Sequence, residues 1–170
     1  MAQKEDFLQA FDQLSDGIFR YCYFRVYDRE TALDLVQETF MKTWQHMAAG
    51  HEVRNLKAFV YQVAKNSVID YFRSKKALSL EELQEQNGFD PGLDSREQLS
   101  AQIDAGFILK LLEKVEEPYR TAVYLRYTED LSPQEIAEIT GETANVVSVR
   151  IHRGLEYLRT IVKRESHESQ

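Results

Sequence analysis

The sequence predicts an all-α protein of two small helical domains joined by an acidic linker. Apolar residues recur at helical spacing over long stretches, for example at Ala32, Leu35 and Val36. The 170 residues include only seven glycines and three prolines, which leaves room for long helices. Between the helical parts, acidic and turn-forming residues interrupt this periodicity. We therefore expect a first domain at 1–76, a linker at 77–102 and a second domain at 103–165.

The first domain is expected to contain three helices. The apolar pattern of the first helix consists of Phe7, Leu8, Phe11, Leu14, Ile18 and Phe19. Asp28 is a suitable N-cap for the second helix, whose inward apolar stripe continues to Trp44. A loop at 48–52 follows, and the third helix is predicted over 56–76, with Tyr61 on its outer face.

The second domain carries strong signals for helix ends. Pro118 fits the first position of a helix. Ser132 and Glu135 have the spacing of a capping box, with a proline at the first helical position between them. Gly141 suits the left-handed residue that ends this helix, and Thr143 can cap the next one. A helix, a short turn and a second helix are therefore predicted.

The net charge of −7 is unevenly distributed. Residues 1–76 carry 11 basic and 10 acidic residues, a balance of +1, and residues 107–170 carry 9 and 11, a balance of −2. Residues 77–106 carry 1 basic and 7 acidic residues, a balance of −6. Because neutralisation of phosphates supplies most non-specific affinity for DNA, the chain is expected to bind DNA weakly unless a partner helps.

Several kinds of site are not expected. Cys22 is the only cysteine, so an internal disulfide or a cysteine-based zinc site is excluded. The four histidines lack ligand-type spacing, and neither a glycine-rich phosphate loop nor a nucleophile constellation is present. We therefore predict no metal, no cofactor and no enzymatic activity. Neither an apolar run of about 20 residues nor an apolar signal core occurs, so we expect a cytoplasmic protein without membrane contact of its own.

The helix–turn–helix pattern predicts contact with duplex DNA, because this geometry places one helix in the major groove. Arg150 and Arg153 lie three residues apart on the second helix, and arginine can bind guanine or phosphate through two hydrogen bonds. A plain helical hairpin with solvated arginines is the alternative. The candidate contacts are Thr143, Asn145, Ser148, Arg150 and Arg153.

Two further polar faces are candidates for binding. On the second helix of the first domain, Asp34, Gln37 and Glu38 share one face that suits a basic partner surface, although such faces are often only solvated. The third helix combines cations with aromatic rings, a pattern that suits single-stranded nucleic acid but also a basic helix end. The members of this group are Tyr61, Lys65, Asn66, Tyr71, Phe72, Arg73, Lys75 and Lys76.

Three segments in order resemble the extracytoplasmic-function (ECF) group of bacterial RNA polymerase sigma factors. Residues 32–44, ALDLVQETFMKTW, are similar to the family's core-binding helix, and residues 59–73, FVYQVAKNSVIDYFR, to its −10-element and melting segment. Residues 118–127 and 131–159 are similar to region 4, which binds the −35 element. The family's recognition helix usually opens Gly-Thr-Val-Lys-Ser-Arg. Here residues 145–150 read NVVSVR, which implies fewer polar or basic contacts.

The resemblance implies partners and site residues. Core RNA polymerase would be bound through Asp34, Leu35, Gln37, Glu38 and Lys42. The single-stranded −10 element would be bound through Tyr61, Lys65, Asn66, Arg73, Lys75 and Lys76. The duplex −35 element would be bound through Thr143, Asn145, Ser148, Arg150 and Arg153. The loop at 47–55, together with Lys65 and Asn66, would hold a flipped base, and an anti-sigma factor would cover these faces.

The acidic linker has two interpretations, a mimic of nucleic acid in the RNA path of the polymerase or a solvated tether. Its acidic residues are Glu81, Glu82, Glu85, Asp90 and Asp94. Two other functions remain open for the whole chain. The first is a helix-turn-helix regulator that binds an operator as a dimer without core polymerase, and the second is a degenerate sigma-like module that binds polymerase without selecting promoters.

Overall fold

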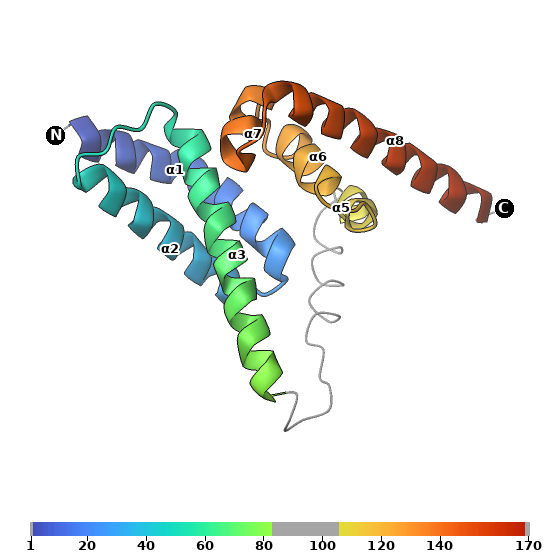
Figure 1. Cartoon of the computed structure of the whole chain (residues 1–170), viewed down its shortest axis with the longest axis horizontal. Helices are drawn as coiled ribbons and strands as arrows, with labels where there is room; N and C mark the ends of the chain where they lie inside the picture. Colours follow the sequence, from blue (N-terminus) through green and yellow to red (C-terminus); the bar gives the residue numbers. More distant parts are fainter. Residues whose placement is uncertain (1, 83–105, 169–170) are drawn as a thin grey trace. The chain divides into compact units, whose positions relative to one another are not determined.

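The computed structural model describes residues 2–82 and 106–168, and every regular element within them is a helix (Figure 1). The chain divides into two compact units, residues 1–95 and 96–170. The first unit holds α1 (Ala2–Val26), α2 (Arg29–Ala48) and α3 (Leu56–Glu82). The second holds α5 (Gly106–Glu113), α6 (Tyr119–Tyr127), α7 (Pro133–Thr140) and α8 (Ala144–Glu168). The all-α, two-domain fold class is therefore confirmed.

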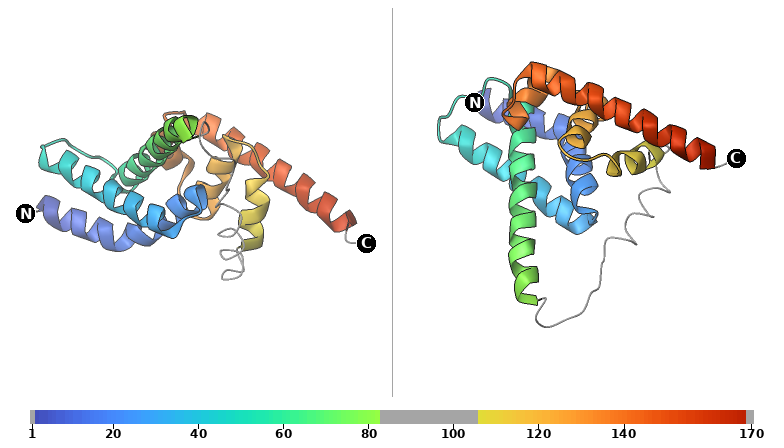
Figure 2. Two further views of the ribbon diagram at one scale, coloured as in Figure 1. Left: turned by 90° about the horizontal axis from the view of Figure 1, so that it is seen from below. Right: turned by 45° about the vertical axis from the view of Figure 1, so that its right-hand side comes forward.

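In the first unit, α1, α2 and α3 pack pairwise against one another (Figures 1 and 2). Asp28 caps α2 as predicted, because its carboxylate accepts a hydrogen bond of 3.1 Å from the Thr31 backbone amide. Cys22 is fully buried between the helices. The largest part of this core is apolar and comprises Ile18, Tyr21, Phe24, Leu35, Phe40, Val60, Tyr61, Ala64 and Val68.

The predicted end of the third helix at residue 76 is wrong. Helix α3 continues to Glu82, so the first six residues of the predicted linker are helical. The reason is local, because this stretch of alanine, leucine, serine and glutamate contains neither glycine nor proline, and its acidic residues are good helix formers. The predicted linker residues Glu85, Asp90 and Asp94 lie outside the described residues.

In the second unit, α8 packs against α5, α6 and α7 (Figure 2). Pro118 is the N-cap residue of α6, whereas we predicted it at the first position within the helix. The core that these helices share comprises Leu111, Leu112, Val115, Val123, Leu125, Ile136, Ile139, Val147 and Ile151. No helix within 2–82 or 106–168 is sufficiently long and apolar to cross a membrane.

Candidate partner and nucleic-acid interfaces

The polar face of α2 lies on the surface of the first unit. Asp34 and Gln37 are exposed, and Glu38 forms an ion pair of 2.6 Å with Lys42 one turn later. Leu35 was predicted to contact a partner, but only 4% of its surface is exposed. The reason is helix geometry, because Leu35 continues the buried stripe of α2 while its neighbour Asp34 points outward. Leu35 therefore supports this face from inside and is not part of it.

The face of α2 also contains apolar side chains that the sequence analysis missed. Leu33 is 45% exposed and Met41 is 56% exposed, on either side of Gln37 at a spacing of four residues. The sequence could have indicated their exposure, because neither residue belongs to the apolar stripe of α2 that is buried. Trp44, predicted to point inward, is 38% exposed, although its ring lies 5.2 Å from that of Phe7. Methionine and aromatic side chains are enriched at protein interfaces, so Met41 and Trp44 fit a surface that binds a partner.

Two threonines fix the inner side of this helix. Thr39 and Thr43 are completely buried, which is unusual for a polar side chain. The Thr39 hydroxyl donates a hydrogen bond of 2.7 Å to the Leu35 carbonyl, and the Thr43 hydroxyl donates one of 2.8 Å to the Thr39 carbonyl. Because both hydroxyls are satisfied within the helix, α2 can pack closely without an unpaired polar group.

The basic face of α3 is separated into an exposed part and a buried part. Asn66, Arg73, Lys75 and Lys76 are exposed, and Lys65 is half-buried. The prediction that Tyr61 lies on the outer face of α3 is wrong. Its ring is 2% exposed and packs edge to face against Tyr21 at 6.3 Å, because it continues the buried stripe of α3.

The exposed face of α3 becomes more continuous toward its end. From Phe72 to residue 77 every side chain is exposed, so none of the described helices covers this part of α3. The Lys75 ammonium lies 5.9 Å from the centre of the Tyr71 ring, within the range of a cation–π contact. This exposed part of α3 therefore carries both aromatic rings and cations.

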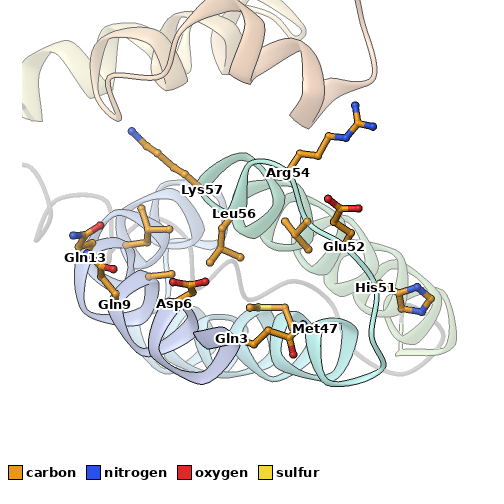
Figure 3. Close-up of a pocket in the computed structure, with 13 residues that line it drawn as sticks. Gln3, Asp6, Gln9, Gln13, Met47, His51, Glu52, Arg54, Leu56 and Lys57 are labelled. Carbon is orange, nitrogen blue, oxygen red and sulfur yellow. The ribbon is translucent and has the colours of Figure 1, made fainter. Parts of the chain in front are cut away.

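The loop between α2 and α3 borders a hollow of about 520 Å³ (Figure 3). Polar side chains of α1, among them Asp6 and Gln9, line the side opposite the loop. Leu56 and Met47 point toward the hollow, whereas Arg54 extends away from it (Figure 3). The lining does not include Lys65 or Asn66, so the structure does not place these two residues in the same hollow as the loop.

The start of this loop is held by stacked rings. His46, near the end of α2, lies 4.6 Å from His51 in the loop and 4.6 Å from Phe59 on α3, measured between ring centres. The interplanar angle is 27° for the stacked pair His46–His51 and 32° for the tilted pair His46–Phe59. The start of the loop is therefore attached to α2 and, through His46, to α3.

Helices α7 and α8 form the predicted helix–turn–helix. Ser132 and Glu135 make the reciprocal hydrogen bonds of a capping box, and Gly141 ends α7 in the left-handed conformation with a φ of 76°. The Thr143 hydroxyl accepts a hydrogen bond of 3.2 Å from the Val146 backbone amide. The predicted capping of both helices is therefore confirmed. This bond also means that Thr143 has a structural role, whatever else it contacts.

The outer face of α8 carries the predicted duplex contacts. Asn145, Ser148 and Arg153 are exposed, and Arg153 makes no ion pair within the described part of the chain. Arg150 differs, because its guanidinium donates a hydrogen bond of 3.1 Å to the carboxylate of Glu142 in the turn. The two arginines therefore differ, because the Arg153 side chain is exposed whereas the Arg150 guanidinium is paired with Glu142.

The pairing of Arg150 gives a testable expectation. Glu142→Gln removes a negative charge that would compete with DNA for Arg150, so binding of this chain to duplex DNA should become about two- to fivefold tighter. The measurement is the affinity for duplex DNA over a salt series. Glu138→Gln, on the exposed face of α7, is the matched control and should have no comparable effect. Equal affinities of wild type and Glu142→Gln would contradict a competing role for Glu142.

Gly154 allows α8 to approach α6 closely. A β-carbon at this position would lie 2.4 Å from Cγ2 of Val123 and 3.2 Å from the Tyr119 carbonyl oxygen. We expect Gly154→Ala to destabilise the second unit by about 1–3 kcal/mol, although alanine ordinarily favours helices. Urea unfolding measures this loss, and Ser148→Ala on the exposed face of α8 should change stability by less than about 0.5 kcal/mol. An unchanged midpoint for Gly154→Ala would refute the close packing.

Comparisons with known proteins agree with this architecture. The Sigma-70 region 2 family model matches residues 10–78, and the Sigma-70, region 4 model matches residues 108–158. The chain is 30% identical over 166 residues to the ECF RNA polymerase sigma factor SigW of Bacillus subtilis, which covers 92% of this chain and 88% of that protein. It is 27% identical over 147 residues to the RNA polymerase sigma factor SigV of the same organism, with 86% and 85% covered.

Two solved structures share the fold. The sigma factor RpoE, solved in complex with the anti-sigma factor NepR from Bartonella quintana, aligns with a TM-score of 0.72 at 22% identity and covers 94% of this chain and 98% of its own. CnrH, solved in complex with the cytosolic domain of CnrY, aligns with a TM-score of 0.67 at 18% identity, with 95% and 90% covered. At these identities the likeness concerns the fold alone.

Proposed function

The chain belongs to the extracytoplasmic-function sigma factors, and from this premise we propose that it binds core RNA polymerase and directs promoter recognition, DNA melting and the initiation of transcription. The observation that carries this proposal is the presence, on one chain, of an exposed mixed face on α2 and a capped helix–turn–helix in α7 and α8. The first supports attachment to a protein, and the second supports contact with duplex DNA.

We propose that core polymerase binds one exposed surface of α2, which we call the α2 face. This face consists of Leu33, Asp34, Gln37, Glu38, Met41 and Lys42. Its carboxylates can pair with basic groups of the polymerase, and its two exposed apolar side chains supply area that is removed from water on binding. Because Glu38 and Lys42 already form an ion pair, Asp34 and Gln37 are the groups most available to a partner.

Contact with the −35 element is assigned to the first turns of α8. Arg153 is exposed, and Arg150 lies beside it with its guanidinium paired to Glu142. Asn145 and Ser148 add hydrogen-bonding groups on the same exposed part of the helix. A recognition helix contacts base edges mainly through its N-terminal residues, which is the part where these side chains lie.

Contact with the −10 element is assigned to α3 and to the loop before it. Asn66, Arg73, Lys75 and Lys76 form the exposed group, with Lys65 half-buried beside them. The hollow beside the loop is lined by amide and carboxylate groups of α1, which can form hydrogen bonds with an unstacked base. Capture of such a base favours the melted state, so binding rather than hydrolysis would drive strand opening.

The net charge of the chain is consistent with DNA binding that depends on core polymerase. With a net charge of −7, the free protein is poorly suited to bind DNA by itself. Binding to core polymerase makes each weak DNA contact effectively intramolecular, which raises its effective concentration. Sigma factors are not enzymes, and we propose that this chain has no enzymatic activity and acts in the cytoplasm. An anti-sigma factor that covers the same faces is the expected regulator.

Run-off transcription on a promoter library tests the proposal, with bacterial core polymerase in the presence and absence of this chain. We expect selective initiation only when both are present. Tight co-purification with core but no initiation would indicate a degenerate sigma-like module. Binding to a duplex operator that core polymerase does not affect would indicate a helix-turn-helix regulator.

A further inference from the structure

Two valines occupy the exposed side of the recognition helix. Val146 is 37% exposed and Val149 is 42% exposed, whereas Val147 between them is 1% exposed and belongs to the core. The exposed pair lies three residues apart, so both side chains are on one face within the first two turns of α8. Burial in the hydrophobic core of the second unit therefore does not explain these two residues.

The valines border a hollow of about 490 Å³ between α8 and the start of α6. Pro118 and Tyr119 line its other side, and Arg150 and Arg153 of α8 also line it. Arg150 is paired with Glu142, while Arg153 is exposed. The exposed surface at the start of α8 therefore combines two apolar side chains, Val146 and Val149, with the neighbouring cations Arg150 and Arg153.

An apolar group in this position has one chemical counterpart in the major groove. The C5-methyl of thymine is the apolar group that base pairs present there, whereas the other groups are hydrogen-bond donors and acceptors. A valine side chain can exclude water from this methyl but cannot satisfy a donor or acceptor. It thus favours thymine and disfavours bases that need a hydrogen bond at the same place.

We propose that Val146 and Val149 are specificity-determining residues that read thymine methyl groups in the −35 element. The inference rests on the proposed function, because it requires α8 to enter the major groove of promoter DNA. The arginines then supply affinity through phosphates or guanine, and the valines select thymine at the base pairs that face them.

Removal of the methyl alone tests this inference. The full chain is combined with core polymerase, and its preferred −35 element is first selected from a library of duplex sequences. Each thymine of that element is then replaced by deoxyuridine, which keeps the hydrogen-bonding edge and lacks only the C5-methyl. We expect enrichment of thymine in the selection and a loss of promoter affinity of about three- to fivefold for each methyl that the valines contact.

The variants make the assignment specific. Val146→Ser/Val149→Ser should bind promoters with thymine and with deoxyuridine equally at these positions, and its selected element should lose thymine only there. Val162→Ser is the matched control, because Val162 is 43% exposed on the same helix but four turns further along. This control should keep the full sensitivity to the methyl.

Three results would overturn the inference. They are a selected element without thymine, equal affinities of the wild type for thymine and deoxyuridine, and unchanged methyl sensitivity in the double variant. Specific initiation together with any of these results leaves the proposed function standing and removes only the thymine readout. Failure to form any specific promoter complex with core polymerase removes both.

Discussion

Asp34→Ala/Gln37→Ala is expected to weaken binding to core RNA polymerase by about 30- to 1,000-fold. This range corresponds to the loss of about 2–4 kcal/mol, which is typical when the central residues of an interface are truncated. Both side chains are exposed, so their removal should leave the fold of the first unit intact. They lie between Leu33 and Met41, where a partner would exclude water and strengthen each polar contact.

The affinity is measured by titration of labelled protein with core polymerase, and circular dichroism checks the fold of each variant. Gln13→Ala/Asp16→Ala is a matched control, because it removes the same two residue types at the same spacing from the exposed surface of α1. We expect the control to bind core polymerase like the wild type. Equal loss in both double variants would indicate a non-specific effect of charge, and no loss in either would remove the α2 face as the attachment site.

Cys22 should react with iodoacetamide about a thousandfold more slowly than an exposed cysteine at pH 8. Burial raises the pKa of its thiol from 9.0 to about 12, and the nearby Arg25 only partly offsets this effect. Because the thiolate is the reactive form, an increase of about three pKa units lowers its population at pH 8 by about three orders of magnitude. The side chain is also fully enclosed, which denies the reagent access.

The exposed reference is Met41→Cys in a Cys22→Ala background, because Met41 is 56% exposed. A native rate within tenfold of this reference would contradict the burial of Cys22. The sign of the pH effect on stability also follows. Between about pH 9 and 12 the unfolded chain loses the thiol proton while the folded chain retains it, so the free energy of unfolding falls as the pH rises through this range.

Local helix chemistry was predictable from the sequence. Asp28, Ser132 and Gly141 each act within a few residues of their own position, and their roles depend on backbone groups that every helix end leaves unsatisfied. The sequence therefore located most helix starts and the helix–turn–helix. The end of α3 was less predictable, because acidic composition suggested a linker although none of residues 77–82 disfavours a helix.

Exposure of single residues was harder to predict. Leu35 and Tyr61 resemble functional positions by their neighbours, yet each continues a buried stripe, and the depth of burial depends on helices from elsewhere in the chain. The ion pair between Arg150 and Glu142 joins residues eight positions apart across a turn, so helical spacing alone cannot reveal it. The exposed Val146 and Val149 became significant only when the packing of α8 distinguished them from Val147.

The straight row of cations on α3 has a consequence for the single-stranded DNA that we propose it binds. From Lys65 to Lys76 a helix rises by about 1.5 Å per residue, which gives a rigid row of roughly 16 Å. A single DNA strand that contacts the whole row must match this length. Because a helix has a constant rise per residue, the spacing of these cations is set before any polymerase is bound.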